Sequence, residues 1–269
     1  MKSAHYRIWI IILSLIVAFE TFLLYSLGRR LKQDIHLKTK FSSKPKQVTA
    51  YKARIAIVLD DWGYNLDTVD LLNEINIPLT ISVLPELRYS QKIARDQAAK
   101  GRQIILHLPM EPYEKLPLEQ STILTSMDNN QIRRIINTHL NSIPYLKGVS
   151  NHMGSKATSD RRVMRILFEE LKKRNLYFLD SFVSPKTVAK EVAKELGLSW
   201  IRRDVFLDNK LEKEYIKGQL LKLKSKADIQ GQAVGIGHAR RLTLQVLKET
   251  TPEFKKQGYR FVLLSELLP

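Results

Sequence analysis

The chain has 269 residues and a mass of 31.1 kDa, enough for one large domain or two small ones with a full hydrophobic core. Its composition, 44% apolar and 26% charged residues, excludes a disordered or collagen-like chain, and the absence of cysteine excludes disulfides, Cys-ligated zinc, iron–sulfur clusters and thiol catalysis. The net charge of +17 is spread over helix-like segments such as 169–174 and 210–226, without an interleaved aromatic stripe. This pattern favours a basic surface in anionic surroundings over nucleic-acid recognition.

The N-terminal segment resembles a signal sequence. Residues 8–27 are apolar except for Glu20, Thr21 and two serines, and twenty helical residues span about 30 Å, the thickness of a bilayer core. Lys2 and Arg7 precede this run, and no small-x-small cleavage site follows it. We therefore predict an uncleaved signal anchor, a transmembrane helix, within residues 1–30.

Two other interpretations of this segment stay open. One is a cleaved secretory signal. The other is an anchor with the body in the cytoplasm, because Arg29, Arg30 and Lys32 place positive charge on the far side of the run. Residues 31–53 are polar, basic and without apolar periodicity, which indicates a linker. A folded body is expected over residues 54–269.

The body alternates short β-rich runs with helical patterns. Strands are expected over residues 55–59, 79–84, 103–108, 148–151, 177–179, 199–202, 233–236 and 260–264. Helices are expected over residues 66–75, 90–100, 129–142, 159–174, 185–196, 212–227 and 242–257. Asp128, Thr158 or Ser159, and Ser184 followed by Pro185 are the expected N-terminal caps.

Seven or eight strand–helix units in the body indicate an α/β fold with a parallel sheet. A closed barrel is favoured over an open doubly wound sheet. No GxGxxG or Walker-type glycine loop follows any strand, which disfavours a nucleotide-binding version of the open fold. Residues 111–127 form one long insertion, which in a barrel would overhang the active face.

Ionisable residues gather where the expected strands end. They are Asp60, Asp61, His107, His152, Asp180, Asp204, Asp208 and His238. Any single one is explained as a helix cap or turn former, but the carboxyl ends of barrel strands meet at one rim, the face on which such folds build their sites. The combination of carboxylates and histidines predicts a metal site with an acid–base partner.

Asp60 and Asp61 end the first strand. Adjacent strand residues point to opposite sides, so one carboxylate is expected to bind a metal and the other to meet the attacking water. Two carboxylates this close do not both stay ionised without a nearby cation. A simple Asx turn assisted by Gly63 is the alternative explanation.

The histidines complete the candidate set. His107 lies in an apolar strand and His152 in a short polar loop, while His238 stands in the run GIGHAR, whose glycines permit close approach. An Asp and two His leave open positions on a divalent metal, as in catalytic zinc sites. A second carboxylate would act as base, and a histidine would protonate the leaving nitrogen.

Six segments in order resemble the divergent polysaccharide deacetylase family, a branch of the NodB-homology carbohydrate esterases. They are IAIVLDDWGYN, LPLTISVLPE, IILHLPMEP, GVSNHMGSKATSD, FLDSFVSP and VGIGHAR. The resemblance implies a distorted (β/α)7 barrel and a metal-dependent N-deacetylase. It also implies that Asp60 is the catalytic base, Asp61 and His107 are metal ligands, and His238 is the acid.

The sequence departs from that family pattern at the metal motif. The superfamily has His-x3-His, whereas Glu111 occupies the second position here, and Asn151-His152 stands where an Arg-x-Pro segment is expected. We predict that His152 supplies the third ligand, with Glu111 as the fallback. Asp180, Asp204 and Asp208 are candidates to orient His238.

These expectations combine into a membrane-anchored, extracytoplasmic hydrolase that uses a divalent metal, with zinc first, to remove N-acetyl groups from a cell-envelope polysaccharide or peptidoglycan-like glycan. The alternative is a catalytically inactive glycan-binding or envelope-assembly protein on the same fold.

Overall fold

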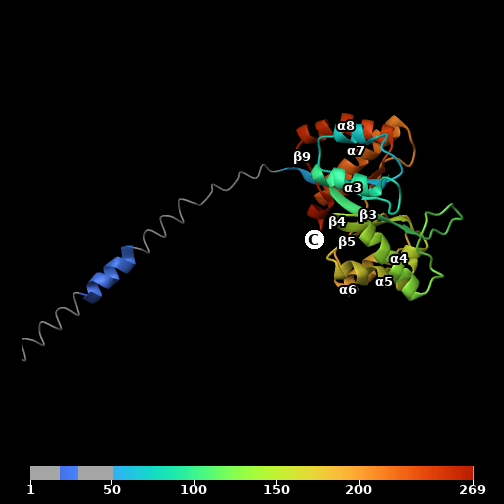
Figure 1. Ribbon diagram of the computed structural model, residues 1–269. Coiled ribbons are helices and arrows are strands. Elements are labelled where there is room, and N and C mark those ends of the chain that lie inside the picture. The colour runs from blue at the N-terminus through green and yellow to red at the C-terminus, as the bar shows by residue number, and fades with distance from the viewer. Residues whose placement is uncertain (1–18, 30–50, 269) are drawn as a thin grey trace, which may run out of the picture. The chain divides into compact units, whose positions relative to one another are not determined.

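A computed structural model describes residues 19–29 and 51–268 of the chain (Figure 1). The chain divides into two units, Met1–Ala50 and Tyr51–Pro269. Residues 19–29 are helical. Across the described parts of the chain, we find no helix with both the length and the apolar character that a bilayer crossing requires. Residues 8–18 of the span predicted over 8–27, and residues 31–50 of the linker predicted over 31–53, lie outside the described residues, whereas residues 19–27 of the span belong to the described helix.

The second unit alternates strands and helices. Its strands are β1 (Ala53–Trp62), β2 (Thr80–Val83), β3 (Gln103–Met110), β4 (Leu146–Met153), β5 (Tyr177–Asp180), β6 (Trp200–Arg202), β7 (Val205–Phe206), β8 (Gln232–His238) and β9 (Tyr259–Val262). Its α-helices are α2 (Val69–Asn73), α3 (Ser90–Ala99), α4 (Asn129–Ser142), α5 (Arg161–Lys173), α6 (Ala189–Leu196), α7 (Lys213–Gln230) and α8 (Arg241–Lys256). Short 3-10 helices cover Ala157–Ser159 and Leu264–Leu267.

All strand pairs in the sheet are parallel, and the strand order is β6-β5-β4-β3-β2-β1-β8-β7, with β9 beside the first half of β1. This order follows the chain around the sheet without reversing. Right-handed crossovers therefore place successive helices on the outer face of the curled sheet. Because the sheet curls, these helices surround the strands, and Figure 1 shows α7 and α8 on one side of the barrel and α4, α5 and α6 on the opposite side. The distorted α/β barrel is confirmed, with no ladder joining β6 to β7 among the described strands. We call this gap the seam.

Two hydrophobic clusters occupy the two faces of the sheet. Ile55, Ile57 and Leu59 of β1 belong to the larger cluster between the strands and the helices. Ala56 and Val58, the alternating residues, belong to a smaller cluster on the inner face. Strand side chains alternate between the two faces with a period of two. At the carboxyl end of each strand, the residues that continue the inner-face series therefore face the mouth of the barrel.

Most predicted elements are present, with shifts at some ends. Asp128 caps α4 with a capping box, as predicted. The N-cap of α5 is Asp160 and not Thr158 or Ser159, because the Asp160 side chain accepts from Val163 N while residues 157–159 form a 3-10 turn.

The start of α6 also differs from the prediction. Ser184 Oγ accepts a hydrogen bond from Lys186 N in a turn, and the helix begins only at Ala189. Strand β7 was not predicted, because two residues are too few to produce a sequence pattern.

Candidate metal centre

Four of the predicted site residues extend the inner face of the sheet. Asp60 continues the series of Ala56 and Val58 in β1, and it lies beside His238 in the parallel register of β1 and β8. His107 lies beside Ser150 in the register of β3 and β4, and His152 follows on the same face of β4. The period of two therefore carries side chains from four strands to one end of the barrel.

Asp61 reaches the same place by a different route. The register of β1 with β2 shifts between Leu59 and Trp62, and Asp61 has a φ of +63°. This left-handed conformation is one that Asp adopts more readily than most residues. The expectation that Asp60 and Asp61 point to opposite sides was therefore wrong. Asp60 Oδ2 lies 3.7 Å and Asp61 Oδ1 3.2 Å from the same atom, His107 Nε2.

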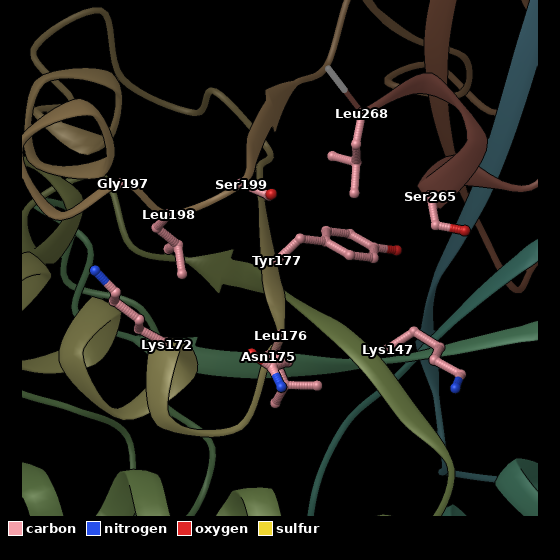
Figure 2. A pocket seen from close by; sticks show the side chains of 10 residues that line it. All are labelled: Lys147, Lys172, Asn175, Leu176, Tyr177, Gly197, Leu198, Ser199, Ser265 and Leu268. Atoms are coloured by element: carbon pink, nitrogen blue, oxygen red, sulfur yellow. The ribbon is translucent and has the colours of Figure 1, made fainter.

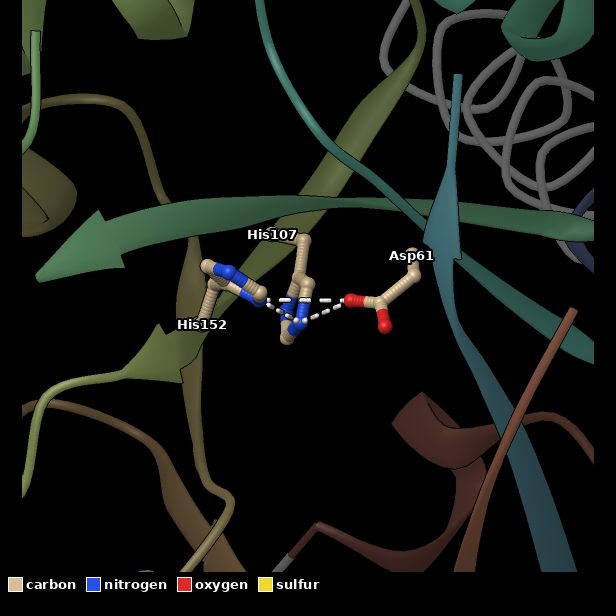
Figure 3. Close-up of side chains that lie close together, drawn as sticks. All are labelled: Asp61, His107 and His152. Carbon is tan, nitrogen blue, oxygen red and sulfur yellow. Dashed lines mark hydrogen bonds and ion pairs between the residues drawn. The ribbon is translucent and has the colours of Figure 1, made fainter. Parts of the chain in front are cut away.

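Asp61, His107 and His152 form a compact group that could hold a metal ion, and Figure 3 shows their side chains converging from β1, β3 and β4. Asp61 Oδ1 lies 3.2 Å from His107 Nε2 and 3.2 Å from His152 Nδ1, and the two nitrogens are 3.3 Å apart. Ligand atoms about 2.0–2.1 Å from a tetrahedral ion lie about 3.3–3.4 Å from one another. The triangle therefore has the size that a zinc-like ion needs.

The surroundings of these atoms fit a cation. Asp60 Oδ1 is buried and has no hydrogen-bond partner among the described residues, and Asp61 Oδ1, also buried, faces the two histidine nitrogens. An unpartnered buried carboxylate oxygen is costly unless a positive group compensates it. Two imidazoles and a carboxylate are a usual donor set for zinc and for other first-row divalent metals.

His107 is held in place by a serine pair behind it. Ser150 Oγ lies 2.8 Å from His107 Nδ1, and Ser82 Oγ lies 2.8 Å from Ser150 Oγ. The contact occupies Nδ1 and leaves Nε2 facing Asp61, which is how outer partners orient a ligating histidine. Sequence inspection missed both serines. The period of two in β2 and β4 is the signal that would have placed them on the inner face.

The two aspartates differ in their proton affinity. Burial raises the pKa of Asp60, and the neighbouring charge of Asp61 raises it further, against the opposing influence of His107. Burial would also raise the pKa of Asp61, but the close contacts of His107 and His152 with its carboxylate lower that pKa well below its usual range. Asp61 is thus suited to remain an anionic ligand, while Asp60 is the stronger base.

His238 lies across the site and is oriented by Asp208. His238 Nδ1 is 2.7 Å from Asp208 Oδ1, and His238 N donates to Asp208 Oδ2 at 2.9 Å. Burial is the largest single influence on the pKa of His238 and lowers it, but the hydrogen bond to Asp208 and the negative charges of Asp208, Asp61 and Asp60 together raise the net pKa. Thr243 Oγ1 donates to the same carboxylate at 2.6 Å, and Phe206 stacks on the imidazole with an interplanar angle of 8°.

Glu111, the fallback ligand, is occupied elsewhere. Its carboxylate accepts hydrogen bonds from Thr125 N and Thr125 Oγ1, both at 2.6 Å, and from Lys156 Nζ at 2.8 Å. Burial raises the pKa of Glu111, but the bonds from Lys156 and Thr125 outweigh it and lower the pKa. These bonds fasten the insertion to the loop after β4.

The other two candidates for orienting His238 also have different partners. Asp180 accepts from Phe182 N and Thr187 Oγ1, and Asp204 accepts from Val234 N. Of the three candidate aspartates, Asp208 is the one that the structure brings to His238. Asp208 follows the unpredicted strand β7, which explains why the sequence did not distinguish it from Asp204.

Comparisons with known proteins bear on the same region. Residues 57–268 match the family model described as divergent polysaccharide deacetylase. The chain is 35% identical over 196 residues to YibQ of Escherichia coli K12, an alignment covering 73% of this chain and 61% of that protein. It is 34% identical over 199 residues to a protein of Haemophilus influenzae, covering 73% of this chain and 70% of the relative. The chain thus spans less than two thirds of the length of YibQ.

The fold also resembles solved structures. The crystal structure of ATU2773 from Agrobacterium tumefaciens C58 superposes with a TM-score of 0.76 at 23% identity, covering 81% of this chain and 90% of that one. At this identity the likeness concerns the fold, and it supports the curled parallel sheet with flanking helices.

Proposed function

Because this chain belongs to the divergent polysaccharide deacetylase family, we propose that it is a metal-dependent hydrolase that removes N-acetyl groups from a cell-envelope glycan. The observation that carries the proposal is the triangle of Asp61 Oδ1, His107 Nε2 and His152 Nδ1, with sides of 3.2, 3.2 and 3.3 Å. A structural role alone does not explain why two histidines and a carboxylate converge beside the buried Asp60 Oδ1, which has no hydrogen-bond partner among the described residues.

Asp61, His107 and His152 would hold the metal, with zinc as the ion that best suits two imidazoles and one carboxylate. When bound, such an ion supplies Lewis acidity toward an amide carbonyl and increases the acidity of a water molecule. The protein contributes rigidity to the ligands. His107 is fixed by Ser150, and His152 and Asp61 stand on strands in the middle of the sheet.

Asp60 and His238 would divide the proton transfers of amide hydrolysis between them. Asp60, with its raised pKa, accepts a proton from the attacking water. His238, whose protonated form is stabilised by Asp208, donates a proton to the nitrogen that leaves as an amine. General acid–base catalysis requires a base and an acid whose pKa values are adjusted by their surroundings. The raised pKa of Asp60 makes it a better base, and the raised pKa of His238 keeps it protonated as the acid.

A glycan substrate is supported by two exposed aromatic side chains near the rim. Tyr64, 49% exposed, follows the Asp60–Asp61 strand, and Tyr113, 55% exposed, lies in the insertion after β3. The Tyr64 hydroxyl is hydrogen-bonded to Glu119 of the insertion, so this segment is fastened at the mouth of the barrel. Exposed rings with one polar end are suited to packing against the apolar face of a sugar.

We further propose that residues 1–30 anchor the protein in a membrane with its body on the extracytoplasmic side. The apolar run at residues 8–27 and the preceding Lys2 and Arg7 support this proposal. A reporter fused after Pro269 tests it. Periplasmic alkaline phosphatase activity is expected, and activity of a cytoplasmic reporter in its place would contradict the proposed orientation.

The catalytic proposal is tested by two measurements on the purified body, Tyr51–Pro269. Elemental analysis after incubation with zinc should find a stoichiometric metal that the Asp61→Ala/His107→Ala variant lacks. Acetate release from acetylated chito-oligosaccharides and from peptidoglycan should require the same residues. If the body binds no divalent metal, the proposal fails. If it holds metal and binds glycan without releasing acetate, the inactive binding protein replaces the enzyme.

A further inference from the structure

The end of the barrel opposite the metal centre carries lysines without acidic partners. Its members lie before or at the start of strands, or at the ends of helices, and we call them the amino-end face. They are Lys52, Lys100, Lys147, Lys172, Lys255 and Lys256, together with the exposed tyrosines Tyr51 and Tyr145. None of these six amines lies within ion-pair distance of a carboxylate of the described chain.

Helix ends explain only part of this set. Lys172 lies in the last turn of α5, and Lys255 and Lys256 lie in the last turn of α8, where positive charge stabilises the helix dipole. Lys147 is the second residue of β4, and Lys52 directly precedes β1, so neither lysine belongs to a helix. The hydrogen bond from Lys52 N to Gly258 O places this lysine beside the end of α8.

A groove at this end combines apolar and cationic walls. It has a volume of about 430 Å³, and Figure 2 shows Leu176, Leu198 and Leu268 around the ring of Tyr177, with Lys172 at one margin and Lys147 at the other. The two amines point away from each other, so the groove is not shaped to enclose one small anion. Apolar walls between separated amines instead suit an amphiphile, whose hydrocarbon contacts the leucines while its anionic groups meet the lysines.

A second hollow lies at the same end of the barrel. It has a volume of about 780 Å³ and is lined by Lys100, Arg102 and Lys255, with Glu266 as its one carboxylate. Tyr145, 63% exposed, precedes β4. Tyrosines with exposed rings are typical of protein surfaces that contact the interfacial region of a bilayer.

We propose that the amino-end face docks the body onto an anionic phospholipid surface. Lysines without acidic partners attract anionic headgroups, even though Lys172 Nζ and Lys255 Nζ also donate to the exposed backbone oxygens of Leu196 and Asn76. The groove and the two tyrosines supply contacts at the depth of the glycerol region. The chain enters the folded unit at Tyr51–Ala53, on this same face, while Asp61 and His238 stand at the opposite ends of their strands. Docking in this way leaves the metal centre open to a polymeric substrate. The inference does not depend on the catalytic proposal.

Vesicle co-sedimentation of the body, Tyr51–Pro269, tests the inference. This unit is used alone because it forms a separate compact unit with its own core. We expect binding to vesicles of phosphatidylglycerol mixed with phosphatidylcholine, and little binding to phosphatidylcholine alone. Each lysine near an anionic surface contributes about fivefold to partitioning. Lys147→Gln/Lys172→Gln and Lys255→Gln/Lys256→Gln should each therefore weaken binding by about 25-fold.

The matched control is Lys115→Gln/Lys222→Gln, which removes the same charge from two exposed lysines that belong to the insertion and to the middle of α7. It should weaken binding by at most about twofold, because screening confines surface charges to short range. Equal loss in the control and test variants would overturn the inference, as would equal binding to neutral vesicles. Metal content should be unchanged in all three variants, and each should unfold as one cooperative transition, although the loss of the bonds from Lys172 to Leu196 O and from Lys255 to Asn76 O lowers Tm slightly in the two test variants. Binding to single-stranded DNA that depends on the same lysines and exceeds vesicle binding would replace the lipid with a nucleic acid.

Discussion

Asp208 holds His238 at two points, accepting a hydrogen bond from the backbone N–H through Oδ2 at 2.9 Å and contacting Nδ1 through Oδ1 at 2.7 Å. The carboxylate thereby fixes the position of the residue and the orientation of its ring. Nε2 is left free and lies 3.9 Å from Asp61 Oδ2. A proton on Nε2 is consequently directed at the site and not at solvent.

Replacing this carboxylate should change the pH dependence of activity. The Asp208→Asn variant should reduce kcat by about 10- to 100-fold. Activity that needs protonated His238 is lost as pH rises through the pKa of His238, which Asp208 raises. The alkaline limb of the kcat profile should therefore move to lower pH in the variant. Thr243→Val keeps the carboxylate and should leave this limb nearly in place; an equal shift in both variants would contradict the role of the charge.

The same pair should make stability depend on pH in the metal-free protein. The pKa of His238 is raised in the folded protein. Its contribution to the free energy of unfolding is therefore complete below the pKa of unfolded His and is lost as pH rises through the pKa of folded His238. The pKa of Asp208 is lowered by His238 despite burial. The contribution of Asp208 to the free energy of unfolding is therefore complete above the pKa of unfolded Asp and is lost as pH falls through the pKa of folded Asp208. The Tm difference between the wild type and Asp208→Asn should be largest between about pH 4 and pH 6.5. A difference that stays constant across this range and beyond it would count against the pair.

His152 and Glu111 should differ sharply in metal binding. The His152→Ala variant should lose zinc or bind it at least about 10-fold more weakly, because it removes one of three ligand atoms. The Glu111→Gln variant should keep the metal, because Glu111 is bonded to Thr125 and Lys156. Its effect should appear as increased proteolysis of the insertion. Isothermal titration with zinc and limited proteolysis distinguish the two variants. Loss of metal in Glu111→Gln would show that Glu111 is a ligand.

Asp60 should be separable from the metal ligands. The Asp60→Asn variant is expected to keep stoichiometric metal and to lose about 10²- to 10⁴-fold in kcat, the usual range for removing a general base. Elemental analysis and acetate release on the same preparation give both values. Loss of metal together with activity would instead make Asp60 a ligand, in keeping with its 3.7 Å distance from His107 Nε2.

A pair of glycines tests the packing of the inner face. A Cβ at Gly148 would lie 2.6 Å from the ring of buried Tyr177, so Gly148→Ala should destabilise the fold by about 1–3 kcal/mol. Gly218 lies within α7 with open space around its Cα. There the same substitution should stabilise by about 0.5–1 kcal/mol. Urea unfolding monitored by circular dichroism compares the two, and equal effects would argue against the close contact.

The sequence predicted the alternation of strands and helices well, because long amphipathic patterns such as α4 and the buried run of β1 are strong local signals. It also predicted the carboxyl-end rim that carries Asp61, His107 and His152. The bulge at Asp61 could not be predicted, because a register shift is decided by pairing with β2 and not by local propensity. The choice of Asp208 over Asp204 likewise depends on the pairing of β7 with β8.

Because of the seam between β6 and β7, the parts of the candidate metal centre differ in their stability against local unfolding. Asp61, His107 and His152 stand on strands that have a hydrogen-bonded neighbour on both sides, whereas Asp208 follows β7, an edge strand of two residues. Edge elements with few pairings open first in local unfolding. A molecule that opened at the seam would keep its ligand triangle while losing the carboxylate that directs His238. Metal retention and proton donation would then fail at different concentrations of denaturant, so that a metal-loaded protein need not be a working one.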